Sequence, residues 1–253
     1  MALDPYIHWI FASVLLSLRI APAFTFAPPF TLTRLSPLFR ALFGLALAAC
    51  MVSMAPAADL AFSLTAYDLV MSALRELAMG LVFVLALQVT FGALYVAGRV
   101  LDIQAGFGLA AVLNPTTGEQ DPLIGSLFVY GAAATFFALG AQLDLLRIMR
   151  ASLDAVPIGA WRFPGSLEPL TGFLAAAFAV AFGVAGGGIL CLFLADLAIG
   201  LLSRTVPQMN VLILGLQVKT LLVLLVLPAT FGAAGALLTR LAAVTLDSIP
   251  RLL

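Results

Sequence analysis

Apolar residues occur in long uninterrupted runs along this chain. Runs without a charged side chain cover residues 41–58, 77–98, 122–143, 169–195 and 220–239. A helix needs about 20 residues, at 1.5 Å per residue, to cross the apolar core of a bilayer. Each run therefore predicts a membrane helix, the first of them marginally.

Two further runs extend this pattern. Residues Pro5 to Thr33 form a sixth run that is interrupted only by Arg19, and Thr205 to Val218 form a shorter seventh. We expect six nominal spans. Hydrophobic residues make up 63% of the chain and charged residues 9%, against roughly 25% charged in a soluble domain. The chain is therefore predicted to be an integral membrane protein.

The balance of charge and the positions of the cysteines argue against several kinds of partner and processing. Twelve basic and twelve acidic residues balance, so nothing points to nucleic acid as a partner. No basic residue precedes Arg19, which argues against a cleavable signal peptide. Cys50 and Cys191 lie in apolar runs, where small buried side chains are expected rather than a disulfide.

The first run contains features that a simple span avoids. Proline in a helix interior removes a hydrogen bond, so Pro22, Pro28 and Pro29 argue against one straight helix. Arg19 near the middle would cost about 2.5–3.5 kcal/mol on insertion scales. It either pairs with a carboxylate or carbonyl group, or it snorkels or faces an aqueous lumen.

The polar connections predict local structure. Residues 59–76 are expected to form an amphipathic lead-in to the next helix, with Glu76 as a helix-end residue. Residues 144–168 begin as a helix that places Asp144 and Arg147 one turn apart, and this segment is the predicted boundary between two halves. The glycines of the run FGVAGGGI at residues 182–189 are expected to mark tight helix packing.

Two segments stand out from ordinary spans. In DIQAGFGLAAVLNPTTGEQDP, at 102–122, Gly106 and Gly108 flank Phe107, and Asn114-Pro115 then breaks any helix. Such an apolar turn, neither span nor solvated loop, predicts a gate or plug. The second segment is RTVPQMNVLILGLQVKT at 204–220, which places polar residues and the single lysine around an apolar centre.

The residues of enzyme sites are missing from the sequence. The single histidine, His8, has no linked serine or cysteine motif, and one histidine with two separated cysteines does not make a usual zinc site. Neither Asp102 nor Asp196 has the flanking glycine motif of an intramembrane aspartate pair. We therefore expect no catalysis, no metal and no cofactor.

These segments carry a resemblance to a known family. In order along the chain they read LRIAPAFTFAPPF and SPLFRALFGLALA, then RELAMGLVFVLALQ, DIQAGFGLAAVLNP, VPIG at 156–159 and LLSRTVPQMNVLILGLQVK at 201–219. In these motifs the chain resembles the FliR family of the flagellar and type III secretion export gate. Gln142 departs from the family pattern, where histidine is frequent.

The resemblance implies a fold and partners. The fold class expected is all-α, a polytopic membrane protein with about six hydrophobic helical segments arranged as bent helical hairpins. Residues 1–165 would be similar to FliP and include the plug loop at about 102–122, and residues 166–253 would be similar to the FliQ hairpin. The chain would assemble with FliP and FliQ family subunits, together with FlhB-type and FlhA-type components, in the bacterial inner membrane at the flagellar basal body. Unfolded export substrates would pass through the pore.

The resemblance also suggests roles for residues. The residues expected to line or close the pore are Gly106, Phe107, Gly108, Leu109, Val112, Leu113, Asn114 and Pro115. The residues expected to hold helices together are Arg19, Glu76, Asp102, Gln104, Arg204, Pro207, Asn210 and Lys219. A stand-alone secondary transporter is the alternative, because broken helices and a few membrane-depth charges also occur in transporters.

Overall fold

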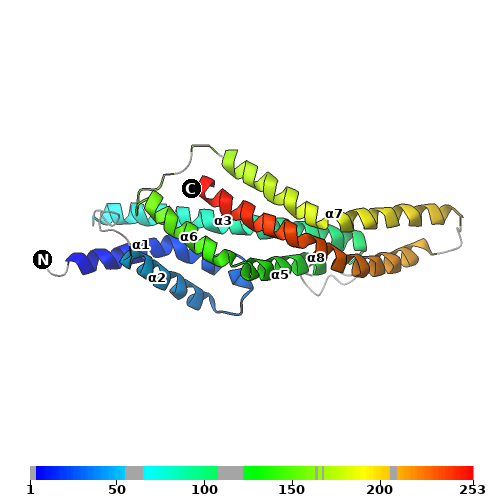
Figure 1. The fold of residues 1–253 in the computed structure, drawn as a ribbon, viewed down its shortest axis with the longest axis horizontal. Helices are drawn as coiled ribbons and strands as arrows, with labels where there is room; N and C mark the ends of the chain where they lie inside the picture. The colour runs from blue at the N-terminus through cyan, green and yellow to red at the C-terminus, as the bar shows by residue number, and fades with distance from the viewer. Residues whose placement is uncertain are drawn as a thin grey trace. The chain divides into compact units, whose positions relative to one another are not determined.

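The computed structural model describes residues 4–54, 65–107, 122–162, 165–166, 168–205 and 210–252. In these residues the chain is helical and contains no strand (Figure 1), which confirms the predicted all-α class. The elements are α1 (Asp4–Phe26), η1 (Phe30–Leu32), α2 (Pro37–Ser53), α3 (Ala66–Ala105), α5 (Leu123–Ala138), α6 (Ala141–Ala155), α7 (Glu168–Thr205) and α8 (Val211–Leu252).

Each of the six predicted hydrophobic segments contains a helix among its described residues. By length and composition, four helices of the described chain can cross a membrane, and a fifth span results if α5 and α6, bent by 71° at their junction, are counted together. Helix α2 is apolar but only 17 residues long, and the predicted seventh run becomes the start of α8. Helix α3, with 40 residues, is about 60 Å long, twice the apolar thickness of a bilayer.

Local sequence sets the ends of the helices. The Ser36 hydroxyl accepts the N–H of Phe39 at 3.3 Å and Pro37 occupies the first turn of α2, as in many helix starts. Thr65 caps α3 in the same way by accepting the N–H of Asp68 at 3.3 Å. Between α5 and α6, Gly140 has a φ of 72°, which glycine adopts without strain.

The prolines of the first run act as predicted only in part. Helix α1 continues through Pro22 and ends at Phe26, just before Pro28-Pro29. Pro22 cannot donate to the carbonyl of Leu18. That carbonyl faces Gly80 of α3, where an added Cβ would lie 2.5 Å from the Leu18 oxygen. Because Gly80 has no side chain, α3 can lie close to the Leu18 carbonyl, which receives no hydrogen bond from Pro22.

The helices contribute to two compact units. Unit 1 comprises residues 1–89, 136–174 and 243–253, and unit 2 comprises residues 90–135 and 175–242. Within unit 2, α7 and α8 run antiparallel (yellow and orange in Figure 1), with Gly183 near Leu237 and Gly215 near Ile199. These two units are groups of residues that contact one another, and they are not continuous stretches of the chain. The predicted division near residue 165 into a FliP-like and a FliQ-like part stays a prediction.

The glycine-rich run of α7 packs tightly at one position only. A Cβ on Gly188 would lie 3.0 Å from a methyl group of Leu101 in α3, but at Gly186 and Gly187 nothing lies within 4 Å. A cavity of about 330 Å³ lies beside Gly183 and Gly187 in unit 2. Among these glycines the predicted tight packing is therefore found at Gly188, while Gly183 makes ordinary contact with Leu237, and the prediction is wrong at Gly186 and Gly187.

Candidate functional site

Helix α3 ends where the sequence predicts a break. Gly106 has a φ of 87°, and its N–H donates to the Ile103 carbonyl at 3.1 Å, while the Phe107 N–H donates to the Asp102 carbonyl at 3.0 Å. These two bonds form the Schellman motif, which satisfies carbonyl groups at a helix C-terminus. Gly106 thereby turns the chain away from the axis of α3.

The side chain of Asp102 binds the start of the next helix. Its oxygens accept the N–H of Ile124 at 3.0 and 3.1 Å and the N–H of Gly125 at 3.1 Å. Helix α5 begins at Leu123, so these amides lie in its first turn and have no acceptor within the helix. Asp102 is only 4% exposed. A carboxylate from α3 therefore caps the positive end of α5.

Two glycines let α3 and α5 touch through their backbones. A Cβ on Gly98 would lie 2.6 Å from the Gly125 Cα, and a Cβ on Gly125 would lie 2.9 Å from the Tyr95 carbonyl oxygen. Tyr95, Gly98 and Asp102 recur at helical spacing and share one face of α3. Neither Gly98 nor Gly125 was predicted from the sequence; the signal for them is a glycine in each of the two apolar runs on either side of the unusual segment.

The predicted pore residues are only partly described. Gly106 and Phe107 lie at the end of α3, as above. The others lie outside the described residues: Gly108, Leu109, Val112, Leu113, Asn114 and Pro115. Gln104, in the last turn of α3, has a buried side-chain oxygen with no hydrogen-bond partner among the described residues.

In unit 1 a buried ion pair joins α1 to α3. Arg19 Nε donates to Glu76 Oε2 at 2.6 Å and its second terminal nitrogen donates to Glu76 Oε1 at 2.8 Å, with both side chains 0% exposed. The guanidinium also donates to the carbonyl oxygens of Ser152 and Val156, each at 3.1 Å. Arg19 thus pairs with a carboxylate, and the alternatives of snorkelling or facing a lumen do not apply.

The same pair holds the VPIG motif. Glu76 accepts the N–H of Gly159 at 2.8 Å, and the neighbouring Arg75 donates to the carbonyl of Gly159 at 2.8 Å. Gly159 has a φ of 76°, and an added Cβ would collide with the hydroxyl of Ser72. Glu76 lies inside α3, so its prediction as a helix-end residue is wrong: the polar lead-in continues directly into the long helix. The bonds of Arg75 to Gly159 and of Ser152 to Arg19 were not predicted from the sequence.

The second unusual segment lies at the α7–α8 connection in unit 2. Lys219 of α8 forms an ion pair with Asp196 of α7, with side chains 19% and 47% exposed. Arg204 is in the last turn of α7, where a cation is favourable. The Asn210 carbonyl and side-chain oxygen accept N–H groups of the first turn of α8. Pro207 lies outside the described residues.

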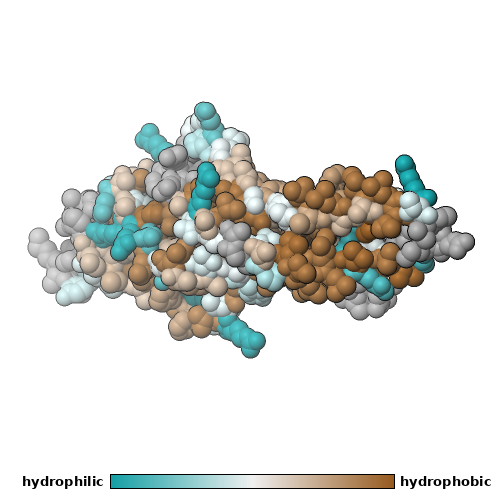
Figure 2. Space-filling view, turned by 45° about the vertical axis from the view of Figure 1, so that its right-hand side comes forward, coloured by the Kyte–Doolittle hydropathy of each residue, from teal (hydrophilic) through white to brown (hydrophobic). Residues whose placement is uncertain are grey.

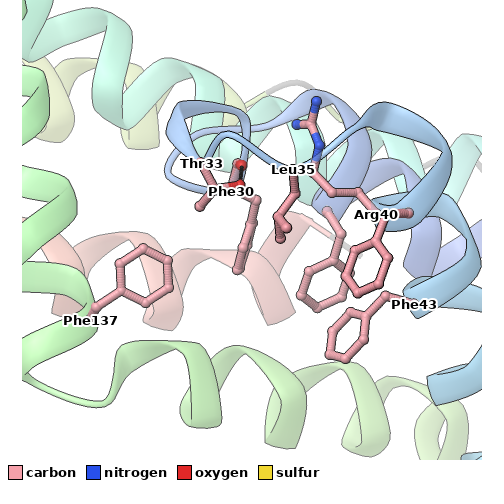
Figure 3. A pocket seen from close by; sticks show the side chains of 8 residues that line it. Phe30, Thr33, Leu35, Arg40, Phe43 and Phe137 are labelled. Carbon is pink, nitrogen blue, oxygen red and sulfur yellow. Dashed lines mark hydrogen bonds between the residues drawn. The ribbon is translucent and has the colours of Figure 1, made fainter.

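An aromatic pocket of about 230 Å³ lies in unit 1. In Figure 3, Phe30 and Phe137 form one side of it and Phe43 lies on the other; the Phe30 and Phe137 ring centroids are 6.0 Å apart. Arg40 reaches away from the rings and donates to the carbonyl of Thr25 at 2.9 Å. The polar lining residues Thr33 and Arg40 donate to the backbone carbonyls of Phe30 and Thr25, so the pocket indicates apolar contact rather than chemistry.

The described residues provide no obvious reactive centre. No group of three His, Cys, Asp or Glu side chains that could hold a metal ion occurs in the part of the chain that the structure describes. Cys50 and Cys191 are both free, but Cys50 is exposed, so the prediction of a buried side chain is wrong there.

Comparison with known proteins gives the context for these features. The family model for bacterial export proteins, family 1, matches residues 10–244. The flagellar biosynthetic protein FliR of Bacillus subtilis is 32% identical over 187 residues, which is 72% of this chain and 71% of the relative. The Yop proteins translocation protein T of Yersinia pestis is 30% identical over 166 residues, 64% of this chain and 63% of the relative. The secretion system apparatus protein SsaT of Salmonella typhimurium is 30% identical over 148 residues, 58% of this chain and 57% of the relative.

Most of the chain thus matches one family, and the matched residues include both ends of α3, the start of α5 and the α7–α8 connection. Relatives with flagellar and with translocation names match 72% and 64% of the chain, and the apolar helices agree with a membrane location. The chain belongs to the bacterial export proteins, family 1, the FliR family of the type III export apparatus.

Proposed function

We propose that this chain is a subunit of the flagellar type III export gate in the bacterial inner membrane, at the basal body. It assembles there with FliP and FliQ family subunits, next to FlhB-type and FlhA-type components, around a pore for unfolded export substrates. The chain itself performs no catalysis. The match to the Bacillus flagellar protein, which extends over more of the chain than the match to the Yersinia protein, favours a flagellar role.

The chain belongs to an export family. The observation that carries the proposal is how α3 ends and α5 begins. Helix α3 stops at Gly106, and the next helix, α5, begins at Leu123. The N–H groups of the two following residues, Ile124 and Gly125, donate to the carboxylate of Asp102. In the sequence, the segment between the two helices begins with Phe107 and continues with the apolar residues 109–113. We propose that this segment, residues 106–122, plugs the pore at rest and excludes water and ions.

Exposed apolar surface supports assembly. Leu38 and Leu42 of α2 are 70% and 54% exposed, and Leu194 of α7 and Leu225 of α8 are 55% and 75% exposed. Figure 2 shows brown, apolar surface over much of the α7–α8 hairpin at the right. Exposed surface of this kind must face lipid or other helices. An assembly with further helical subunits would cover part of it.

Copurification and conductance together test the proposal. The chain should copurify with FliP and FliQ family subunits from a membrane in which all are produced. Deletion of residues 106–113 should leave that assembly intact and make the membrane leaky to small ions. An assembled deletion variant with unchanged conductance would overturn the plug. A stable monomer that binds a small solute and ignores the other subunits would favour a secondary transporter instead.

A further inference from the structure

We propose that the aromatic pocket of unit 1 is a binding site for an anionic phospholipid. One acyl chain of the lipid enters between the phenylalanine rings, and the phosphate lies at the guanidinium groups of Arg34 and Arg40. All the residues concerned belong to unit 1. The inference goes beyond the proposed function, because it needs neither the pore nor the plug.

The walls of the pocket are aromatic rings that stay open to the outside. Phe24 is 5% exposed, and its ring centroid lies 4.6 Å from that of Phe30 and 5.5 Å from that of Phe43. Phe43 and Phe137 line the same cavity but are 45% and 39% exposed, and their rings lie on opposite sides of it (Figure 3). The cavity of about 230 Å³ is smaller than a whole small-molecule site of roughly 300–1,000 Å³. It therefore takes part of one chain rather than a whole lipid.

The pocket lies at one end of a helix that can cross a membrane. By length and composition α1 is such a helix, and its 23 residues extend about 34 Å, close to the apolar thickness of a bilayer. Phe24 is in the last turn of α1, and Phe30 follows in η1. Headgroups lie just outside the apolar core of a bilayer. A lipid beside α1 therefore brings its phosphate to the end of the helix that carries the pocket.

The rim of the pocket carries positive charge without a counter-charge. Arg40 lines the pocket, and Arg34 stands between the lining residues Thr33 and Leu35. No acidic residue occurs at positions 5–58 of the sequence, and neither arginine forms an ion pair among the described residues. Basic residues at a membrane surface attract anionic lipids. Cations beside an apolar hollow thus fit a molecule with an apolar chain and a negative headgroup.

The guanidinium of Arg40 keeps donors that the protein does not use. A guanidinium has five N–H groups, and Arg40 donates one of them to the carbonyl of Thr25 at 2.9 Å. Its Nε has no hydrogen-bond partner in the part of the chain that the structure describes. Arginine binds phosphate oxygens through paired N–H groups. A phosphate beside this guanidinium would supply acceptors for its remaining N–H groups while the acyl chain stays among the rings.

Native mass spectrometry of the full chain, released from detergent micelles, tests the charge of the site. Phosphatidylglycerol and phosphatidylcholine with the same acyl chains differ in headgroup charge. At about fivefold per basic residue, the native chain should bind phosphatidylglycerol about twentyfold more tightly. Arg34→Gln and Arg40→Gln should each lower this ratio about fivefold, and Arg40→Lys, which keeps the charge, should keep most of it. The matched control is Arg240→Gln, at an exposed arginine of α8, which should leave the ratio unchanged.

A second pair of variants tests the pocket itself. Leu35 lines the pocket and is 49% exposed, so Leu35→Trp should narrow it and weaken the binding of both lipids about tenfold, equivalent to the loss of about two buried methylene groups. Leu190→Trp, at a 58% exposed leucine of α7, should leave binding unchanged.

Three outcomes would overturn the proposal. The first is equal binding of the two lipids by the native chain. The second is binding of phosphatidylglycerol that neither Leu35→Trp nor Arg34→Gln weakens. The third is a Leu35→Trp chain that binds lipid normally but no longer copurifies with FliP and FliQ family subunits, because the pocket would then receive a helix of another subunit.

Discussion

The Arg19–Glu76 ion pair gives the sharpest prediction about what holds unit 1 together. Glu76→Gln keeps the size of the side chain and removes its charge. Arg19 would keep its bonds to the carbonyl oxygens of Ser152 and Val156, but its charge would face no carboxylate in a site with no exposed surface. Breaking a buried pair at one partner costs about 3–5 kcal/mol. We expect the free energy of unfolding to fall by about that amount.

A double variant shows where the cost arises. Arg19→Met combined with Glu76→Gln removes the stranded charge, and a buried ion pair can often be replaced by apolar groups at little cost. The carbonyl oxygens of Ser152 and Val156 still lose their donor, so some loss remains. The double variant should therefore be more stable than the sum of the single changes predicts, by at least about 2 kcal/mol.

Tryptophan fluorescence of the purified chain, unfolded by denaturant in detergent, measures these changes. Trp161 is 5% exposed and close in sequence to Gly159, and Trp9→Phe leaves it as the single reporter of the two tryptophans. Asp144→Asn breaks a pair with 48% exposure on the aspartate side and should cost less than about 1 kcal/mol. If Glu76→Gln were no worse than this control, the buried pair would not contribute as argued.

Two further predictions concern helix contacts in unit 2. Gly98→Ala should destabilise the chain by about 1–3 kcal/mol, because its Cβ would lie 2.6 Å from the backbone of α5; Gly92→Ala, where nothing lies within 4 Å, should instead stabilise α3 by about 0.5–1 kcal/mol. Equal midpoints of thermal unfolding for the two variants would contradict the close crossing. Asp196→Lys places two like charges at the ion pair between α7 and α8 and should lower the midpoint of thermal unfolding, whereas the exchange Asp196→Lys with Lys219→Asp should restore it. An exchange variant no more stable than Asp196→Lys alone would count against the register of α7 and α8.

Several predictions from the sequence are confirmed because they depend only on residues within a few positions of one another. Gly106 ends α3 because a left-handed residue is needed there and glycine adopts it without strain. Asp144 and Arg147 pair at 2.6 Å because they are one helical turn apart. Other predictions failed where the outcome depended on a distant neighbour. Glu76 was expected at a helix end, and the glycine run of α7 was expected to be tightly packed throughout.

By itself, the sequence determined the all-α class of the protein, its apolar helices, the break at the end of α3 and the family. Uncharged runs of about 20 residues have few stable states outside a bilayer, and capping and turn residues act within a few positions. Only the tertiary structure decided the partners of the polar residues. Arg19 meets Glu76 across 57 positions of sequence, and Asp102 meets Ile124 across 22. Such pairings follow from how helices pack, because a buried polar group is stable only where the packing brings it a partner.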